Sequence, residues 1–156
     1  MPSHSPSTLC LISQETLTYR STSLQPQVAD LSLCHFLYEQ ATASNSSQSR
    51  ICFHQSDDVL FHSMLVYHSL SHQVPWHKHP IKSESIHLID GSFTLHFRDS
   101  DLQPHSLKLS ASPSDQHPAM IFIPSNTPHR LELHTDIFFI ESTQGPFDQT
   151  STQMIN

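Results

Sequence analysis

The feature that most constrains the fold is an alternation of apolar and polar residues with a period of two, which begins after Arg50. In segment 93–98, F-T-L-H-F-R, every second side chain is apolar, and segment 130–134, R-L-E-L-H, repeats the pattern. Successive side chains of a β-strand point to opposite faces, so both segments are typical of half-buried strands. Further short β-rich runs lie at 51–54, 63–69, 85–89, 119–123 and 137–141. About eight short strands with no helix between them predict a mainly β chain, an antiparallel sandwich or small barrel.

Turn signals separate these predicted strands. Asp90–Gly91 stands between two of them and is a strong signal for a two-residue hairpin. The chain has only two glycines, so Asn, Asp and Pro must supply much of the turn geometry. We expect turns or loops at 100–104 and 110–118.

The region before residue 49 has a different pattern. Residues 1–27 are rich in Ser, Thr, Pro and Gln, and they fit either a short strand at 16–20 or an extended arm. From Val28 to Ser44 the apolar residues recur every three to four positions, which predicts one amphipathic helix with Asp30 as its N-cap. The expected buried face consists of Leu31, Cys34, Leu37 or Tyr38, and Ala41.

We therefore expect three regions along the chain. Residues 1–48 form an N-terminal arm and helix, residues 49–148 form the barrel, and residues 149–156 form a short tail.

Charge and cysteine content narrow the classes of function. Seven Lys and Arg against fourteen Asp and Glu give a net charge of −7. An acidic chain without a basic run is a poor candidate for binding nucleic acid or an anionic membrane, and no apolar stretch is long enough to span a bilayer. Three cysteines without a C-x-x-C pair predict free thiols. The absence of a signal-peptide pattern at the start agrees with a cytoplasmic location.

Four potential metal ligands occur in two distant stretches of the sequence. His77, His79 and Glu84 lie in H-K-H-P-I-K-S-E, and His129 ends P-S-N-T-P-H (124–129). His77 and His79 would share one face of a strand. Glu84 and His129 would each head a row of apolar side chains, where an unpaired charge is costly. These four polar groups therefore need either a metal ion or a network of hydrogen bonds.

The chemistry of this set favours a divalent transition metal. In a chain with fourteen histidines an H-x-H pair alone carries little information, and the glutamate and the later histidine supply the specificity. Three imidazoles and a carboxylate without a thiolate suit Fe(II), Mn(II), Ni(II) or Zn(II). They also leave about two positions open for solvent or substrate.

Both stretches resemble the sequence motifs of the cupins. Segment 77–91, H-K-H-P-I-K-S-E-S-I-H-L-I-D-G, is similar to the first motif, and P-S-N-T-P-H is similar to the second, P-x-G-x-x-H. Asn126 replaces the usual glycine of the second motif and tolerates a positive φ better than most residues. The resemblance implies a double-stranded β-helix with a short N-terminal helix. It also implies that His77, His79, Glu84 and His129 bind one divalent ion.

Within the cupins, residues 28 to about 148 resemble the WbuC-type group. The similar segments include S-R-I-C-F-H (49–54), W-H-K-H (76–79) and E-S-T-Q-G-P-F (141–147). Members of this group are regarded as metalloproteins without an assigned reaction, and some are encoded among polysaccharide and O-antigen genes. The resemblance places Arg50 and His54 near the pocket.

Basic and proton-carrying side chains around the ligands are candidates for binding a substrate. The candidates are Arg50, His54, Tyr67 and Lys82, where Lys82 is either a contact for an anionic substrate or a solvated loop lysine. The chain has only seven Lys and Arg side chains. Two or three of them at the mouth of the metal pocket would favour binding of acidic sugars, sugar phosphates or carboxylates. We expect His87 and Arg130 to point away from the site, and Trp76 and Phe93 to line either the cavity or the core.

The sequence leaves three functions open. The first is a metal-dependent enzyme that acts on a sugar or carbohydrate intermediate of polysaccharide biosynthesis, with a histidine or Tyr67 moving the proton. The second is a non-catalytic sensor or binding module, and the third is a structural cupin that the metal only stabilises. Open coordination favours the first. We also expect a small-molecule ligand and a homodimer that forms through sheet edges or the N-terminal arm.

Overall fold

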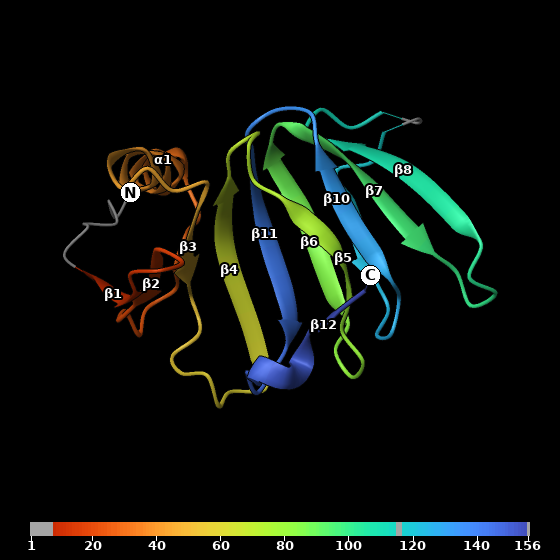
Figure 1. Cartoon of the computed structure of the whole chain (residues 1–156). Coiled ribbons are helices and arrows are strands. Elements are labelled where there is room, and N and C mark those ends of the chain that lie inside the picture. Colours follow the sequence, from red (N-terminus) through yellow and green to blue (C-terminus); the bar gives the residue numbers. More distant parts are fainter. Residues whose placement is uncertain (1–7, 115–116, 156) are drawn as a thin grey trace.

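The structure, a computed structural model, describes residues 8–114 and 117–155, which form two β-sheets and one α-helix (Figure 1). The N-terminal elements are β1 (Leu9–Ser13), β2 (Thr18–Ser21), α1 (Leu31–Ala43), β3 (Gln48–Cys52) and β4 (Phe61–His68). The next strands are β5 (Val74–Lys78), β6 (Glu84–Asp90), β7 (Ser92–Arg98) and β8 (Pro104–Ser110). They are followed by β9 (Met120–Ile123), β10 (His129–Leu133), β11 (Ile137–Gln144) and β12 (Gln153–Met154), with a 3₁₀ turn at Gln149–Ser151.

The two sheets are antiparallel apart from one parallel pair. One sheet has the order β1-β2-β3-β4-β11-β6-β9 and the other β12-β5-β10-β7-β8, and β2 pairs with β3 in parallel. Apolar side chains from both sheets form a common core that includes Phe93, Leu95, Leu109, Ile137 and Phe139. The mainly β prediction is confirmed. Across the described part of the chain, no helix has the length and hydrophobicity that a bilayer crossing requires.

Helix α1 packs on the outer face of the seven-stranded sheet, away from the interior between the sheets. Asp30 is its N-cap, as predicted, and its carboxylate accepts hydrogen bonds from the backbone N–H groups of Ser32 and Leu33. Leu33, Cys34, Leu37 and Ala41 are buried. The expectation for Leu31 was wrong, because its side chain is 81% exposed and Leu33, two residues later, takes the buried position.

The N-terminal region adds strands to the seven-stranded sheet. β1 and β2 form an antiparallel hairpin, and Tyr19 on β2 lies beside Ile51 on β3. The described part of the arm is therefore engaged with its own chain. At the other end, β12 pairs with β5, so residues expected as a short tail belong to the five-stranded sheet.

The turn at Asp90–Gly91 is a corner between the sheets. We expected a hairpin there, but β6 pairs with β11 and β9, whereas β7 pairs with β10 and β8. Gly91 has φ of 86°, and a Cβ atom at this position would collide with the backbone oxygen of Asp136. The turn residues were identified correctly, but a tight turn joins two strands whether or not they pair.

Candidate metal centre

The four predicted ligands meet between the two sheets. His77 lies on β5 and His129 opens β10, where the two residues are paired neighbours in the five-stranded sheet. Glu84 opens β6 in the seven-stranded sheet, and His79 lies in the connection between these strands. The register of β5 and β10 is irregular beside this pair, as in a β-bulge, a feature that often re-aims a side chain at a functional site.

Their potential ligand atoms all lie within 4.8 Å of one another. His129 Nε2 is 2.8 Å from one carboxylate oxygen of Glu84, and His79 Nε2 is 3.3 Å from the other. The ring centroids of His77 and His129 are 4.3 Å apart. Two ligands on opposite sides of a metal ion are at most about 4.4 Å apart for bonds of about 2.2 Å, so small side-chain shifts suffice to close the set around one ion.

Each imidazole is oriented by a hydrogen bond on its far nitrogen. The Nδ1–H groups of His77 and His129 donate to the backbone oxygens of Pro75 and Thr127, both at 2.8 Å. His79 Nδ1–H donates to the backbone oxygen of Ser151 at 3.2 Å. A carbonyl oxygen only accepts, so these bonds fix the proton on Nδ1 and leave a lone pair on Nε2 of each neutral ring.

The centre is therefore built from acceptors. Three Nε2 lone pairs and a carboxylate that face one another are stable only with added protons or with a bound cation. Metal-binding histidines commonly have this arrangement, in which the outer nitrogen is held by a carbonyl and the inner nitrogen is free. The residues present thus fit a divalent metal ion.

Burial and hydrogen bonding set the charges of the ligands. Burial alone would raise the pKa of Glu84, but the hydrogen bonds from His129 and His79 lower it to about 2. Burial lowers the pKa of His77, which favours the neutral form that binds a metal. The hydrogen bond with Glu84 raises the pKa of His79 against the effect of burial. Without a metal ion, a proton shared between His79 and Glu84 supplies part of the positive charge that the ion would bring.

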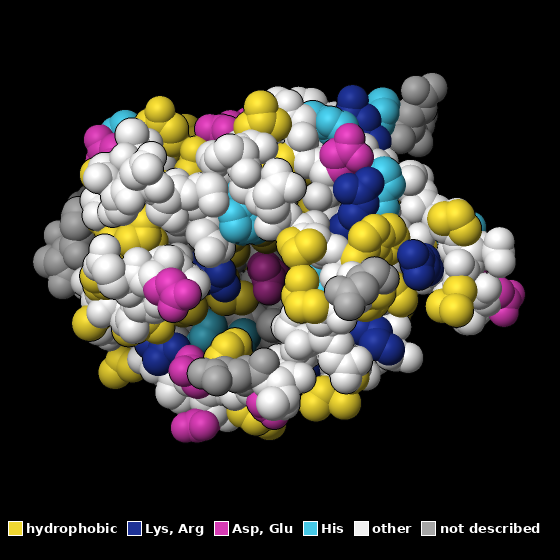
Figure 2. Space-filling view, in the orientation of Figure 1, with side chains coloured by type: hydrophobic (Ala, Val, Ile, Leu, Met, Phe, Trp, Pro, Cys, Tyr) yellow, Lys and Arg dark blue, Asp and Glu magenta, His cyan; other side chains and the backbone are white. Residues whose placement is uncertain are grey.

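The ligands line a cavity of about 270 Å³. The molecular surface is hollowed between β4 and β5, and histidine, acidic and basic side chains gather at this hollow (Figure 2). Apolar residues such as Ile86, Leu131 and Phe139 line other parts of the cavity. The centre is thus open to a small molecule from one side.

Two of the four candidate pocket residues line this cavity. Arg50 reaches it from β3, and Lys82 reaches it from the loop before β6. Lys82 is buried, donates a hydrogen bond to the backbone oxygen of Pro146 at 2.6 Å, and lies 5.8 Å from the ring centroid of Phe147. Its ammonium group therefore holds the segment 146–147 against the cavity, and it is not a solvated loop lysine.

The other two candidates do not line the cavity. His54 lies behind His62, with the two rings stacked 4.0 Å apart. Tyr67 points to the opposite face of β4, into the core under α1, where its hydroxyl donates to Asp136 at 2.9 Å. Burial and this hydrogen bond raise the pKa of Tyr67 well above its usual range. The expectation that Tyr67 moves a proton at the metal is corrected, because the period of two places it on the wrong face.

The remaining residues around the motifs lie away from the centre. His87 is exposed on β6, as expected. The guanidinium groups of Arg98 and Arg130 lie 5.0 and 6.0 Å from the ring centroid of Trp76, and Arg130 points away from the site. Phe93 is fully buried in the core between the sheets.

Sequence reasoning missed three titratable side chains that line the cavity. They are His62 and His68 on β4 and Glu141 on β11. Burial and then the charge of Glu84 raise the pKa of Glu141 to about 7, against the effect of Arg50. A carboxyl group with this pKa can give or take a proton near neutral pH. The signal was present, because Glu141 shares its strand parity with the buried Ile137 and Phe139.

The C-terminal segment closes one wall of the cavity. Ser151 and Thr152 line it, and the hydroxyl of Thr152 lies 3.2 Å from His79 Nδ1. Gly145 allows the chain to pass close to β4, since a Cβ atom there would collide with the backbone oxygen of Val59 and would lie 2.6 Å from His62 Nε2. Residues after the barrel strands therefore help to orient a ligand histidine.

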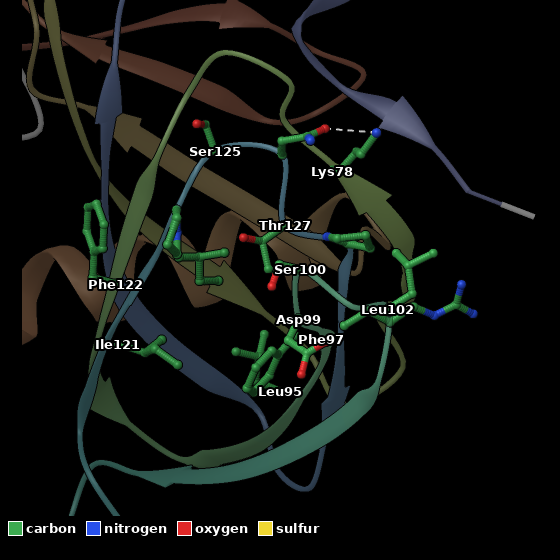
Figure 3. A pocket seen from close by; sticks show the side chains of 15 residues that line it. Lys78, Leu95, Phe97, Asp99, Ser100, Leu102, Ile121, Phe122, Ser125 and Thr127 are labelled. Atoms are coloured by element: carbon green, nitrogen blue, oxygen red, sulfur yellow. Dashed lines mark hydrogen bonds between the residues drawn. The ribbon is translucent and has the colours of Figure 1, made fainter.

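A second, larger cavity of about 550 Å³ lies next to the centre and has a different character. Leu95, Phe97 and Ile121 contribute to its apolar wall, and the ammonium group of Lys78 donates to the Asn126 side chain beside it (Figure 3). Its lining contains no histidine and one carboxylate, Asp99, which is bonded to His105. The smaller cavity is the candidate site because the metal donors lie there and not in the larger one.

Asn126 lines the larger cavity and supports the motif prediction. It has φ of 63°, and its backbone N–H donates to the backbone oxygen of His79 at 2.7 Å. The left-handed turn that glycine usually makes in the second motif is therefore made here by asparagine.

Comparison with known proteins identifies the fold. No model of a known protein family and no curated protein matches the sequence. Several solved structures are similar. CapF, a capsular polysaccharide assembling protein from Staphylococcus aureus, is 18% identical with a TM-score of 0.58 over 70% of this chain and 30% of its own. Oxalate decarboxylase from Lactobacillus farciminis is 15% identical, with a TM-score of 0.50 over 62% of this chain and 27% of its own.

Protein SO0799 from Shewanella oneidensis is similar over more of its length. It is 12% identical, with a TM-score of 0.56 over 69% of this chain and 73% of its own. This chain spans less than a third of the CapF and oxalate decarboxylase chains, and at these identities the likeness concerns the fold. The two β-sheets agree with it. The protein therefore has the cupin fold.

Proposed function

We propose that the protein is a metal-binding cupin of the WbuC type that acts as a metal-dependent enzyme on a small sugar-derived or other anionic molecule. The observation that carries the proposal is the convergence of three oriented Nε2 atoms and a buried carboxylate at the wall of an open cavity. On a six-coordinate ion these four ligands leave about two positions free for a substrate.

The chain contributes the surroundings for such a reaction. His77, His79, Glu84 and His129 would hold the ion, which when bound supplies a Lewis acid for a carbonyl or hydroxyl oxygen. Arg50 and Lys82 give the cavity wall positive charge. CapF is a capsular polysaccharide assembling protein with the same fold, which supports a role for this chain in polysaccharide biosynthesis.

Metal analysis tests the centre directly. Protein purified without a histidine tag should contain or take up about one divalent ion per chain. His129→Ala should lower metal affinity by at least about 100-fold, because it removes one of four ligands. His87→Ala removes an exposed histidine of β6 and is the matched control. Uptake of no ion by the wild type, or equal losses in both variants, would contradict the proposal.

Turnover separates the three kinds of function. An enzyme should convert a member of a sugar-acid and sugar-phosphate panel when metal is present, and His77→Ala should abolish the conversion. Tight binding without conversion would indicate the sensor. A rise in melting temperature with metal, but neither binding nor conversion, would indicate a structural ion.

The proposal also includes the setting of the protein. Cys10, Cys34 and Cys52 are free thiols, which agrees with a cytoplasmic location. A homodimer would pair through a sheet edge, and the edge strand β9 exposes Met120 and Phe122. Light scattering at micromolar concentration tests this, and a monomeric mass would dismiss it.

A further inference from the structure

Unpartnered polar atoms cluster at the cavity. Within the described residues, the buried side-chain nitrogen and oxygen atoms without a hydrogen-bond partner are Arg20 Nε, Arg50 Nε, His62 Nε2 and His68 Nδ1. Three of the four belong to residues that line the cavity of the metal ligands. Buried polar atoms are normally paired, and each unpaired one lowers the stability of the fold. This cavity is therefore built to receive a polar partner.

Two of these atoms lie at the end of the cavity away from Glu84. In the seven-stranded sheet, Arg50 on β3 pairs with Val66 on β4. His68 is the next residue along β4 whose side chain points toward the cavity. In contrast, His62 pairs with Thr143 on β11, which in turn pairs with the metal-ligand candidate Glu84 on β6. His62 therefore lies at the end of the cavity that holds the metal ligands. Burial, His72 and the nearby charge of Arg50 all lower the pKa of His68, which agrees with this proximity.

The positive charge of Arg50 is not held in a salt bridge among the described residues, although it acts on Glu141 at longer range. Its Nη2 group donates a hydrogen bond to the neutral side chain of Gln48 at 3.1 Å. Among the residues described, no carboxylate lies within ion-pair distance of Arg50, although the chain has a net charge of −7. Lys82, the other cation of the cavity, already donates to a backbone carbonyl. Arg50 is thus the cation that remains available to a ligand.

We infer that the cavity binds a small organic acid with two functional ends, one at the metal ligands and a second carboxylate at Arg50 and His68. This inference rests on the proposed function and names the class of its substrate. A hydroxyl and carboxylate at the first end would occupy the two open metal positions. The second carboxylate would accept from Arg50 Nε–H and from His68 Nδ1–H in the tautomer that donates.

The volume limits the length of the acid. About 270 Å³ corresponds to about nine water molecules at about 30 Å³ each. A 2-hydroxy diacid of four or five carbons fits this space, whereas a nucleotide-linked sugar would extend far outside it. The enclosed part of the substrate is therefore small, and any larger group must lie beyond the mouth.

The test compares acids that differ in the second carboxylate. Mn(II)-loaded protein, freed from excess metal, is titrated in a calorimeter with glycolate, malate and 2-hydroxyglutarate. Malate or 2-hydroxyglutarate should bind at least about tenfold more tightly than glycolate, as expected for a charge-assisted hydrogen bond. In Arg50→Gln this difference should shrink to less than about threefold, because the affinity for the two diacids falls more than the affinity for glycolate. Arg98→Gln, whose guanidinium lies over Trp76, is the control and should keep the difference.

The outcomes distinguish this inference from the proposed function. Equal affinity for all three acids in the wild type, or equal weakening of all three by Arg50→Gln, would overturn the inference while metal uptake still supports the centre. Failure to take up Mn(II) or any other divalent ion would overturn both. If Arg50→Gln does not fold, His68→Asn replaces it, with the same expected loss of discrimination. The affinities of the wild-type protein for the three acids test the inference without either variant.

Discussion

The two faces of strands β3 and β4 are both largely buried, but they differ in how their polar groups are satisfied. Under α1, the Ser49 hydroxyl donates to the backbone oxygen of Leu37 at 2.9 Å, and the Tyr19 and Tyr67 hydroxyls bond to Gln40 and Asp136. On the cavity side, Arg50, His62 and His68 each keep an unpartnered buried nitrogen. Neighbours in sequence, such as Ser49 and Arg50, thus face opposite environments.

This difference shows how one sheet serves two purposes. The face under α1 is a closed core in which apolar packing and paired hydrogen bonds stabilise the fold. The cavity face keeps polar atoms unpaired and charges close together, which lowers stability unless a ligand or metal ion satisfies them. Changes on the first face should alter stability alone, and changes on the second should alter binding and pH dependence.

The largest expected effect is on the helix side. Leu65 is fully buried under α1, so Leu65→Ala should lower the free energy of unfolding by about 2–5 kcal/mol, from lost burial and a residual cavity. Denaturant unfolding of the metal-free protein measures this, and Leu70→Ala, at a position 53% exposed, is the control. Metal affinity of the folded variant should not change, and a parallel loss of affinity would show that the two faces are not independent.

The next effect tests the cavity side through its pH dependence. The folded pKa of Glu141 is raised from 4.5 to about 7, so the folded protein holds this proton more tightly than the unfolded chain. Stability is therefore lost as pH rises from about 4.5 to about 7 and stays lower above that range. Glu141→Gln should remove this loss and stabilise the metal-free protein at pH 8 by on the order of 3 kcal/mol.

Thermal or denaturant unfolding of chelator-treated protein between pH 4.5 and pH 8 checks this prediction. The stability gap between Glu141→Gln and the wild type should open with rising pH, while Glu15→Gln, at an exposed glutamate, should follow the wild type throughout. Parallel curves for Glu141→Gln and the wild type would mean that this carboxyl group is not kept protonated by its surroundings.

The smallest expected effect is at Tyr67, which lies on the α1 side of β4 although the next residue, His68, lines the cavity. Tyr67→Phe removes the hydrogen bond to Asp136 and should cost about 1 kcal/mol of stability, with no change in metal uptake or ligand binding. Calorimetric melting and the metal titration above measure both quantities. A clear loss of turnover or of ligand affinity in Tyr67→Phe would place Tyr67 at the site after all.

Local signals predicted several features of this structure because their causes are local. The N-cap at Asp30 depends on a carboxylate and the N–H groups two and three residues later. The left-handed turn at Asn126 depends on one side chain's tolerance of positive φ. In contrast, the helical period predicted Leu31 on the buried face, but the position of the sheet beneath α1 placed Leu33 there.

Features that depend on pairing between distant strands could not be predicted in this way. Asp90–Gly91 has the residues of a hairpin, but the partners of β6 and β7 make it a corner. Both faces of β4 are buried, so its alternation does not reveal which one holds Tyr67. The contact of Ser151 with His79 joins residues 72 positions apart, and no short-range pattern indicates it.

The sequence by itself determined the donor set, since the spacing of His77, His79 and Glu84 and the turn before His129 are properties of short segments. Only the tertiary structure decided the environment of that set, because it chose which face of β3, β4 and β11 looks into the cavity. That choice brought His68 and Glu141 to the cavity and took Tyr67 away from it. The reason is physical: backbone geometry alternates side chains within a strand, whereas packing of the two sheets and α1 assigns each face its neighbours.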